Sequence, residues 1–213
     1  IYTINYTYMA EVSIEKPRGY FDLEYLTRFY HFCNPGRDLE LKDYFERRSM
    51  TMSSPKQMSA VAHDLLRFGV DLRRARTSDM GLGNGYVMAA LSMHDCASYG
   101  YEDDPPQVRA ARRLFERLPL NGGPRPQIIE GDFYNPDTLE RRFDDNTVIS
   151  DIDFFYLFAY RTYGLAGPLA LLNGLRSSGK AKIGAMIYIS TLWNPNNPLI
   201  EQMGFRILPP AEG

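Results

Sequence analysis

The glycine-rich segment 79–85 places the strongest constraint on how this chain can fold. It reads Asp-x-Gly-x-Gly-x-Gly and contains Asp79, Gly81, Gly83 and Gly85. Glycines at alternate positions allow a tight turn and let a ligand approach the backbone, because no Cβ is in the way. The apolar run 87–91 follows at once and favours a helix, whose first N–H groups suit an anionic or strongly polar ligand. Taken alone, the loop fits two interpretations: a ligand-binding loop, or a structural turn between a strand and a helix.

Beyond this loop, segments typical of strands alternate with segments of helical periodicity. The expected strands are 75–80, 97–102, 127–130, 147–153, 182–189 and 204–208. The expected helices run from the loop to about residue 94 and over 105–118, 136–143 and 166–175. This alternation predicts an α/β fold with a doubly wound, mostly parallel sheet of the Rossmann-like type. The first strand fits least well, because Arg73, Arg74 and Arg76 crowd a place where a central parallel strand should be apolar.

The first part of the chain precedes this pattern. We expect residues 1–54 to form an N-terminal arm with a helical appendage or lid, and residues 55–213 to form the ligand-binding domain. Alternating apolar and polar residues at 2–8 indicate a strand. Capping residues and apolar spacing predict three helices, over 22–33, 38–48 and 55–68.

Acidic and aromatic residues follow the expected strands, where an open parallel sheet binds its ligands. Glu102 follows the second strand, Asp132 and Phe133 follow the third, and Asp151 and Asp153 end the fourth. A carboxylate in the position of Glu102 can accept both hydroxyl groups of a ribose. Each residue also has a structural interpretation: a solvated charge for Glu102, a turn residue for Asp132 and a core ring for Phe133. Tyr156 lies in the aromatic run 154–160, which either lines a substrate pocket or covers the sheet.

With these features in this order, the sequence resembles the class I S-adenosylmethionine-dependent methyltransferases. The resemblance covers about 55–208 and rests on the glycine loop, Glu102, the segment Gly131-Asp132-Phe133, Asp151 and the late pair Gly204-Phe205. The loop motif is moderately specific, and the order of the signals adds weight to it. The spacing of 79–87 and the Gly-Tyr-Glu at 100–102 are also similar to the Dot1-type histone lysine methyltransferases.

The resemblance implies an enzyme that uses S-adenosylmethionine as its cofactor, with a role for each matching residue. The backbone from Gly81 to Gly85 would pass the methionine part, and Glu102 would hold the ribose. Asp79, the first residue of the motif, would also belong to the cofactor site. Asp132 and Phe133 would meet the adenine, and Asp151 would stand near the methyl donor. Methyl transfer from a sulfonium is an in-line displacement that depends mainly on the position of the nucleophile. If the nucleophile starts protonated, Asp153 and Tyr156 are the candidates for a catalytic base.

Other interpretations are tested by what the sequence lacks. The Asn/Asp-Pro-Pro-Tyr signature of amino-group nucleic-acid methyltransferases is absent, because 151–154 reads Asp-Ile-Asp-Phe. The Asp-Asn pair of metal-dependent O-methyltransferases is replaced by Ile189-Ser190, so we expect no metal. A nicotinamide-dependent oxidoreductase would need a third glycine at Tyr86. A non-catalytic methyltransferase-like module that binds a partner remains as an alternative.

Composition narrows the classes of partner. The net charge of −2 weighs against nucleic acid, and no apolar run reaches the roughly 18 residues of a membrane span. No leader sequence is visible at Ile1, and Cys33 and Cys96 are too far apart to indicate a disulfide framework. We therefore expect a soluble intracellular protein, cytoplasmic or nuclear, that acts on a protein side chain or on a small-molecule amine or hydroxyl.

Overall fold

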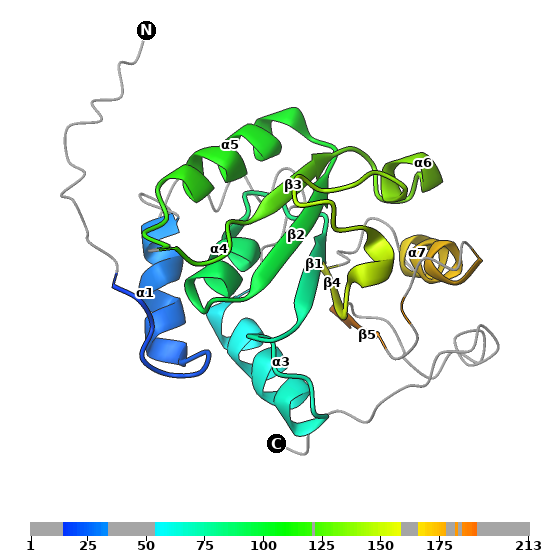
Figure 1. Ribbon diagram of the computed structural model, residues 1–213. Helices are drawn as coiled ribbons and strands as arrows, with labels where there is room; N and C mark the ends of the chain where they lie inside the picture. The colour runs from blue at the N-terminus through cyan, green and yellow to red at the C-terminus, as the bar shows by residue number, and fades with distance from the viewer. Residues whose placement is uncertain are drawn as a thin grey trace, which may run out of the picture.

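A five-stranded parallel sheet with helices on both faces forms the centre of the molecule (Figure 1). The computed structural model describes residues 15–33, 54–120, 122–158, 166–177, 182 and 185–190. Three expected elements lie outside these residues: the strand at 2–8, the helix at 38–48 and the strand at 204–208.

The strands are β1 (Arg76–Met80), β2 (Ala97–Glu102), β3 (Gln127–Glu130), β4 (Phe154–Phe158) and β5 (Met186–Ser190). They lie in the order β3-β2-β1-β4-β5, and every neighbouring pair is parallel. Successive strands leave β1 first in one direction, to β2 and β3, and then in the other, to β4 and β5. Ligands of such sheets bind at this reversal, outside the carboxyl ends of the strands. The predicted α/β fold is confirmed.

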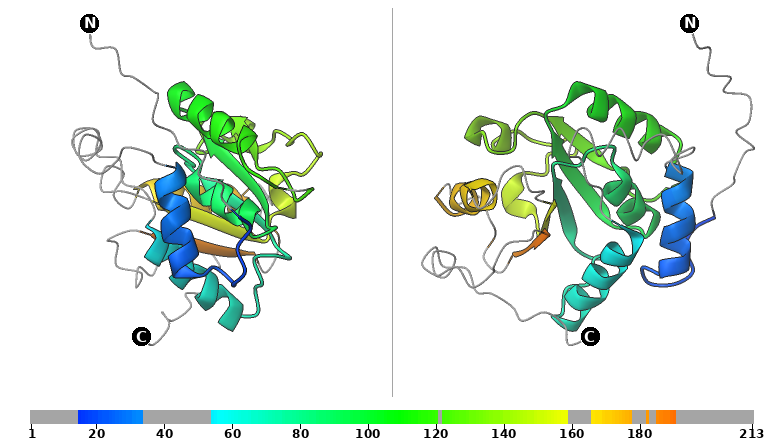
Figure 2. Two further views of the ribbon diagram at one scale, coloured as in Figure 1. Left: turned by 90° about the vertical axis from the view of Figure 1, so that its left-hand side faces the viewer. Right: turned by 180° about the vertical axis from the view of Figure 1, so that it is seen from behind.

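The helices are α1 (Leu23–Cys33), α3 (Pro55–Arg67), α4 (Tyr86–Met93), α5 (Pro105–Glu116), α6 (Pro136–Leu139) and α7 (Ala166–Ser177), and a 3-10 turn, η1 (Ile149–Asp151), precedes β4. The first four cover one face of the sheet, and α6 and α7 cover the other, as the two views in Figure 2 show. In the described part of the chain, no helix has both the length and the apolar character needed to cross a membrane.

The predicted start sites of two helices are confirmed by their capping bonds. Asp22 Oδ1 accepts a hydrogen bond from Tyr25 N at 2.9 Å at the start of α1. Ser54 Oγ accepts one from Gln57 N at 3.1 Å at the start of α3, with Pro55 in the first turn. These side chains satisfy N–H groups that have no partner within the helix, which is why such residues begin helices.

Helix α4, which follows the glycine loop, is buried on all sides. Its close approach to the sheet depends on Gly100 in β2, because a Cβ there would lie 2.3 Å from Met88 Sδ and 2.7 Å from Leu82 Cδ2. A side chain at this position would therefore force the side chains of Met88 and Leu82 to move.

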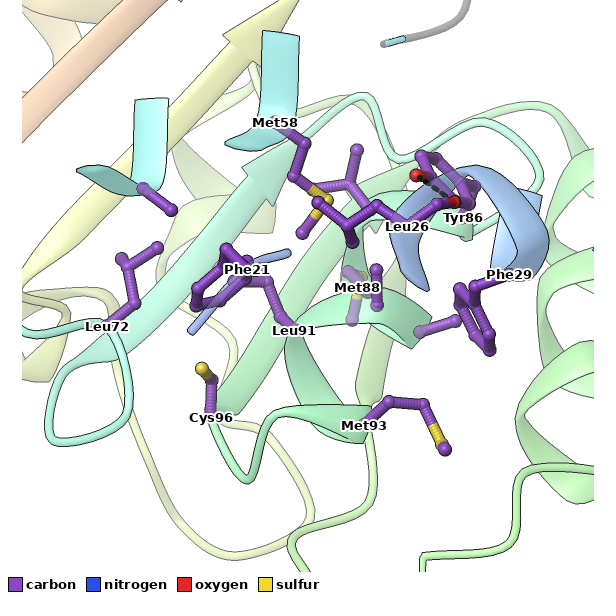
Figure 3. Close-up of a cluster of buried hydrophobic side chains, with 14 of the residues drawn as sticks. Phe21, Leu26, Phe29, Met58, Leu72, Tyr86, Met88, Leu91, Met93 and Cys96 are labelled. Carbon is purple, nitrogen blue, oxygen red and sulfur yellow. Dashed lines mark hydrogen bonds between the residues drawn. The ribbon is translucent and has the colours of Figure 1, made fainter. Parts of the chain in front are cut away.

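The N-terminal helix belongs to the same apolar core as α4. Leu26 and Phe29 of α1 pack with Met58 of α3 and Met88 of α4, and Figure 3 shows the cluster they form. The Tyr86 hydroxyl, at the start of α4, donates a hydrogen bond to the Leu26 carbonyl at 3.4 Å. The appendage expected before residue 55 thus packs directly on the helix that the glycine loop enters.

The arginines that conflicted with a buried first strand lie at or before its exposed start. Arg76 is exposed and opens β1, whereas the four residues after it are buried. Three of these four are polar, and Thr77 Oγ1 donates to the Ala97 carbonyl at 3.0 Å. A central strand of this sheet is therefore polar: Thr77 bonds to the neighbouring strand, and Ser78 Oγ lies 3.4 Å from Met80 Sδ of its own strand.

The prediction of the fourth strand over 147–153 was wrong. Residues Ile149–Asp151 form η1, and the strand is Phe154–Phe158, which pairs with β1 from Thr77↔Phe154 to Met80↔Leu157. A central strand covered on both faces needs a nearly continuous apolar run. The aromatic run supplies it, whereas 147–153 contains Ser150, Asp151 and Asp153.

Two other expected elements are shorter than predicted. Helix α6 ends at Leu139 instead of 143, because the chain turns: Phe143 N–H donates to the Thr147 carbonyl at 2.9 Å. Strand β5 begins at Met186 instead of 182.

Candidate functional site

The glycine loop joins β1 to α4 at the carboxyl edge of the sheet. The N–H groups of Gly81 and Leu82 donate to the Tyr101 carbonyl at 3.0 and 3.1 Å, which fastens the loop to β2. Gly81, Gly83 and Gly85 have φ values of 86°, 55° and 82°. These lie in the left-handed region, which glycine adopts without a Cβ penalty. The conformation of the loop therefore explains why glycine occupies these positions.

Two glycines of the loop differ in the space around them, which gives them different roles. A Cβ at Gly85 would lie 2.8 Å from Ala111 Cβ and from Phe115 Cε1, so this glycine lets α5 pack against the start of α4. A Cβ at Gly83 would meet nothing within 4 Å. Gly83 is thus the position where a ligand can approach the backbone, and Gly85 serves packing.

Glu102, at the end of β2, reaches the loop. Its carboxyl is buried and holds three backbone N–H groups: Oε2 accepts from Gly83 at 2.7 Å, and Oε1 accepts from Asp103 at 3.1 Å and Asp104 at 3.0 Å. Burial raises the pKa of Glu102, and the bonds from Asp104 and Gly83 oppose the rise in part. The position of Glu102 agrees with the sequence-based expectation, and its role as a ligand anchor stays a prediction.

The contribution of Asp103 and Asp104 was missed by the sequence analysis. Their side chains are at least partly exposed, and their backbone N–H groups orient the carboxylate of Glu102. Backbone donors leave no side-chain pattern, so only the geometry of the strand end reveals them.

Asp79 is the second buried acid at this edge. It pairs in register with Gly100 of β2, so Asp79 and Glu102 lie on the same face of neighbouring strands. Only 3% of its surface is exposed, and no described residue donates a hydrogen bond to its carboxyl. Burial, followed by the charge of Glu102, raises the pKa of Asp79 well above its ordinary value. A buried acid without donors is costly to ionise unless a cation comes close.

The residues after β3 reach the loop through Phe133. Its ring atom Cε1 lies 3.4 Å from where a Cβ of Gly81 would be, and its ring contacts that of Tyr134 with centroids 4.2 Å apart. Asp132 is exposed, and its Oδ1 accepts from Tyr134 N at 2.8 Å, which is the bonding of a turn residue. The geometry therefore gives Phe133 a place beside the loop and gives Asp132 a bond within the turn, whereas an adenine contact for either residue stays a prediction.

The expectation that Asp151 and Asp153 lie at the cleft was wrong, because both precede β4. Asp151 Oδ2 accepts from Val148 N at 3.0 Å within the 3-10 turn. Asp153 Oδ2 accepts from Arg76 N at 2.9 Å, and its other oxygen pairs with Lys182. Since Arg76 is the first residue of β1, these acids lie at the amino edge, opposite the glycine loop. Neither is retained as a cofactor-binding or catalytic residue.

Tyr156, the other candidate base, lies on the same side of the sheet as the acids. It pairs in register with Asp79, and it is buried in the cluster that includes α4. Within the described part of the aromatic run, residues 154–157 are core residues of the two faces. Residues 159 and 160 of this run lie outside the described residues.

Acidic side chains predominate among the described residues of the carboxyl edge, where Arg141 Nη1 also donates to the Glu130 carbonyl at 2.7 Å. Besides Asp79, this edge carries Glu102, Asp103, Asp104, Glu130 and Asp132. Arg112 approaches Glu130 at 4.0 Å, across exposed side chains. Among the described residues, no three His, Cys, Asp or Glu side chains come together as metal ligands would. The edge therefore favours a neutral or cationic ligand.

Comparison with known proteins identifies the fold. No family model and no curated protein sequence matches this chain. An S-adenosylmethionine-dependent methyltransferase from Clostridium acetobutylicum matches with a TM-score of 0.50 and 12% identity, over 70% of this chain and 54% of that one. This chain thus spans about half the length of that protein. The chain has the fold of these methyltransferases.

Two further solved structures have lower TM-scores. A Podospora anserina methyltransferase with bound S-adenosylhomocysteine gives 0.47 at 18% identity, over 85% of this chain and 82% of that one. A precorrin-6y C5,15-methyltransferase from Geobacter metallireducens gives 0.49 at 13% identity, over 71% and 70%. The narrower likeness to Dot1-type enzymes gains no support from these structures.

Proposed function

We propose that this protein is a methyltransferase that binds S-adenosylmethionine at the glycine loop and methylates a protein side chain or a small-molecule amine or hydroxyl. The observation that carries the proposal is the contact between Glu102 Oε2 and Gly83 N at 2.7 Å. It joins a carboxylate that can hold a ribose to a glycine of the loop with open space where a Cβ would be. In the methyltransferase fold, as in this chain, the first two strands of the sheet end side by side at the glycine loop.

The charge of the site favours a sulfonium nucleoside over a dinucleotide. Two buried carboxyls, Asp79 and Glu102, stand beside the loop, and no described residue forms an ion pair with either. S-adenosylmethionine carries a sulfonium and an ammonium group, whereas a nicotinamide dinucleotide would bring the negative charges of a pyrophosphate. Like charges at a buried site repel strongly.

The hydrogen-bonding capacity of Glu102 limits how it can hold a ribose. An ionised carboxylate offers about four lone-pair sites, and the N–H groups of Gly83, Asp103 and Asp104 take three. One hydroxyl can be accepted with all three bonds intact. A second hydroxyl would replace the bond from Gly83, so ligand binding and the loop conformation are linked in this proposal. Phe133 would pack on the adenine ring from the far side of the loop.

In the transfer step, a lone pair of the acceptor attacks the methyl carbon as the carbon–sulfur bond breaks. The sulfonium becomes a neutral thioether, and the acceptor loses a proton before or after the attack. The protein contributes mainly by holding the two reactants in line. The acidic edge favours an amine acceptor over the phosphates of a nucleic acid. Tyr156, in register with Asp79, is the residue whose phenol we would test as a base.

Calorimetry with S-adenosylhomocysteine tests cofactor binding. We expect Gly83→Arg and Glu102→Ala each to weaken binding by about 100-fold or more, which corresponds to losing a charged hydrogen bond or filling the site. Gly122→Arg is the matched control, because Gly122 also has a positive φ and open space around it but lies before β3, at the opposite edge. Equal loss in all three variants would argue against the loop as the site.

A methyl-transfer screen with labelled cofactor against protein, RNA and metabolite pools tests catalysis. Label transferred to protein or to a small amine or hydroxyl supports the proposal, and transfer to RNA would overturn the proposed acceptor class. Tight binding without transfer to any pool would favour the non-catalytic module. Stabilisation by NADH but not by S-adenosylhomocysteine would favour the oxidoreductase.

A further inference from the structure

The two buried acids of the site form a pair in which the two carboxyls accept different numbers of hydrogen bonds. Asp79 is 3% exposed and Glu102 is 8% exposed, and they lie on the same face of adjacent parallel strands. Three backbone N–H groups stabilise a negative charge on Glu102, whereas no described residue donates to Asp79. Two like charges buried on the same face of adjacent strands cannot both form at low cost, so we expect the two acids to titrate as a unit.

The groups around the pair offer no compensating charge. The titratable side chains on the elements packed around it are Asp103 and Asp104 after β2, Asp132 after β3, Tyr156 of β4 and Tyr86 of α4. Among the described residues, no lysine, arginine or histidine pairs with either carboxyl. Burial, followed by the charge of Glu102, raises the pKa of Asp79. Because three N–H groups favour the charged form of Glu102 and no described residue donates to Asp79, a proton shared by the pair would reside on Asp79.

We propose that Asp79 and Glu102 hold one proton between them before the ligand binds, and that the pair releases it when the ammonium group of the ligand's amino-acid part enters. This inference rests on the proposed function. The exchange is balanced: the Asp79 carboxyl loses its proton to solvent, and the ligand ammonium takes its place as the cation beside the carboxylate. Asp79 would thus couple the binding of the amino-acid half of the ligand to the release of one proton.

The exchange makes binding depend on pH in one direction. Where the pair is protonated, each unit of rising pH should tighten binding about tenfold, because one proton leaves for each ligand bound. Above the pKa of the pair, the dependence on pH should vanish. The break in the slope measures that pKa directly.

The experiment is calorimetry of S-adenosylhomocysteine binding in phosphate, HEPES and Tris buffers at one pH, repeated across a pH series. The slope of the binding enthalpy against the buffer ionisation enthalpy gives the number of protons released. We expect up to about one proton for S-adenosylhomocysteine. The second probe, 5′-methylthioadenosine, keeps the adenosine and thioether but lacks the ammonium group, and we expect it to bind with no proton release.

Two variants locate the proton. Asp79→Asn keeps the size of the side chain and removes its titration, so S-adenosylhomocysteine should bind without proton release and without pH dependence. Glu130→Gln is the matched control, because Glu130 pairs in register with Glu102 but is exposed, and proton release should be unchanged. The buffer series on the unmodified protein stands by itself if Asp79→Asn fails to fold.

The outcomes separate this inference from the proposed function. Proton release with S-adenosylhomocysteine alone, lost in Asp79→Asn, supports it. Binding of S-adenosylhomocysteine without proton release at every pH overturns the inference and leaves the proposed function standing. Equal release with 5′-methylthioadenosine, or release that persists in Asp79→Asn, also overturns it. Binding of neither probe overturns the proposed function itself.

Discussion

The carboxylates at the two edges of the sheet differ in their partners and in the direction of their pKa shifts. At the amino edge, Asp153 accepts from Arg76 N and pairs with Lys182, and Asp145 accepts from the Tyr99 hydroxyl at 2.8 Å. Their partial burial would raise the pKa of Asp145 and Asp153, but these bonds and charges outweigh it and lower both. At the carboxyl edge, burial prevails, and the pKa values of Asp79 and Glu102 are raised.

The direction of the pKa shift distinguishes acids that stabilise the fold from acids available to bind a ligand. An acid whose pKa is lowered by its own protein neighbours stabilises the fold at neutral pH, because its charge is already compensated. An acid whose pKa is raised, and which has no cation nearby, costs stability when it ionises. A bound cation would offset that cost. Such groups gather at functional sites more often than elsewhere. The sheet thus has one edge that holds it together and one edge available for chemistry.

The largest effect should come from a carboxyl-edge residue that serves packing and not the ligand. Gly85→Val should lower the free energy of unfolding by at least about 3 kcal/mol, from the Ala111 and Phe115 clash and the positive φ together. Gly122→Val, with the same sign of φ and open space, should lose only about 1–2 kcal/mol. Chemical denaturation of both variants measures the difference, and equal losses would contradict the packing role of Gly85.

The next largest effect should appear in acid, at the end of α4 near the amino edge. His94 stacks on Phe21 with centroids 4.1 Å apart, and its Nδ1 lies 2.9 Å from the Ala90 carbonyl. Burial lowers the pKa of His94 to about 4, below the ordinary 6.5. The unfolded chain therefore takes up the proton first, and about 3 kcal/mol of stability should be lost as pH falls from 6.5 toward 4.

Urea denaturation at several pH values, on the unmodified protein and on His94→Phe, checks this prediction. Phenylalanine keeps the stacking on Phe21 and removes the titration, so the variant should lose much less stability in acid. The same acid sensitivity in both proteins would assign the effect to other groups.

Matched substitutions at the two edges should have smaller effects on the free energy of unfolding, with opposite signs. Asp153→Asn should cost about 1 kcal/mol at neutral pH, because the Lys182 pair is partly exposed to solvent. The lowered pKa means that this contribution is present above the ordinary Asp range and is lost as pH falls through the lowered value. Asp79→Asn should have the opposite sign and stabilise by up to about 1 kcal/mol, since the raised pKa costs stability as pH rises through it.

Denaturation of both variants near pH 7 and near pH 3 measures these signs. The gap between them should shrink in acid, where both carboxyls approach neutrality. Destabilisation of similar size by the two substitutions at neutral pH would remove the distinction between the edges.

The smallest effect on stability should come with a clear effect on the ligand. Gly83→Ala should cost about 1 kcal/mol of unfolding free energy, because φ is 55° and no atom blocks the Cβ. Its affinity for S-adenosylhomocysteine should fall about tenfold or more, since the methyl group occupies the space left for the ligand. Gly122→Ala should match the stability loss and keep the affinity, which calorimetry checks.

The sequence was sufficient to predict the glycine loop and the position of Glu102 because both depend on local features. Gly81, Gly83 and Gly85 adopt the positive φ angles that their residue type allows, and strand β2 was predicted with its observed bounds. The carboxyl end of that strand then had to lie beside the loop in a parallel sheet. Local chemistry and sheet topology together determined this part of the site.

The fourth strand could not be placed from local features. The segments 147–153 and 154–158 both contain apolar runs, and the choice between them depends on pairing with β1, a contact between residues far apart in the chain. The aromatic run satisfies that pairing, with Phe155 and Tyr156 on opposite faces of the sheet. The shift moved Asp151 and Asp153 to the amino edge and removed two predicted site residues. Long-range pairing decided this part of the structure.

The packing of α1 on α4 has a practical consequence for anyone who shortens the protein. A version that starts at residue 55 would lose Leu26 and Phe29 from the shared core and would remove the acceptor of the Tyr86 hydroxyl. Such a fragment would expose apolar surface next to the helix that follows the loop and would tend to aggregate. The boundary drawn from sequence between appendage and domain is therefore no place to cut.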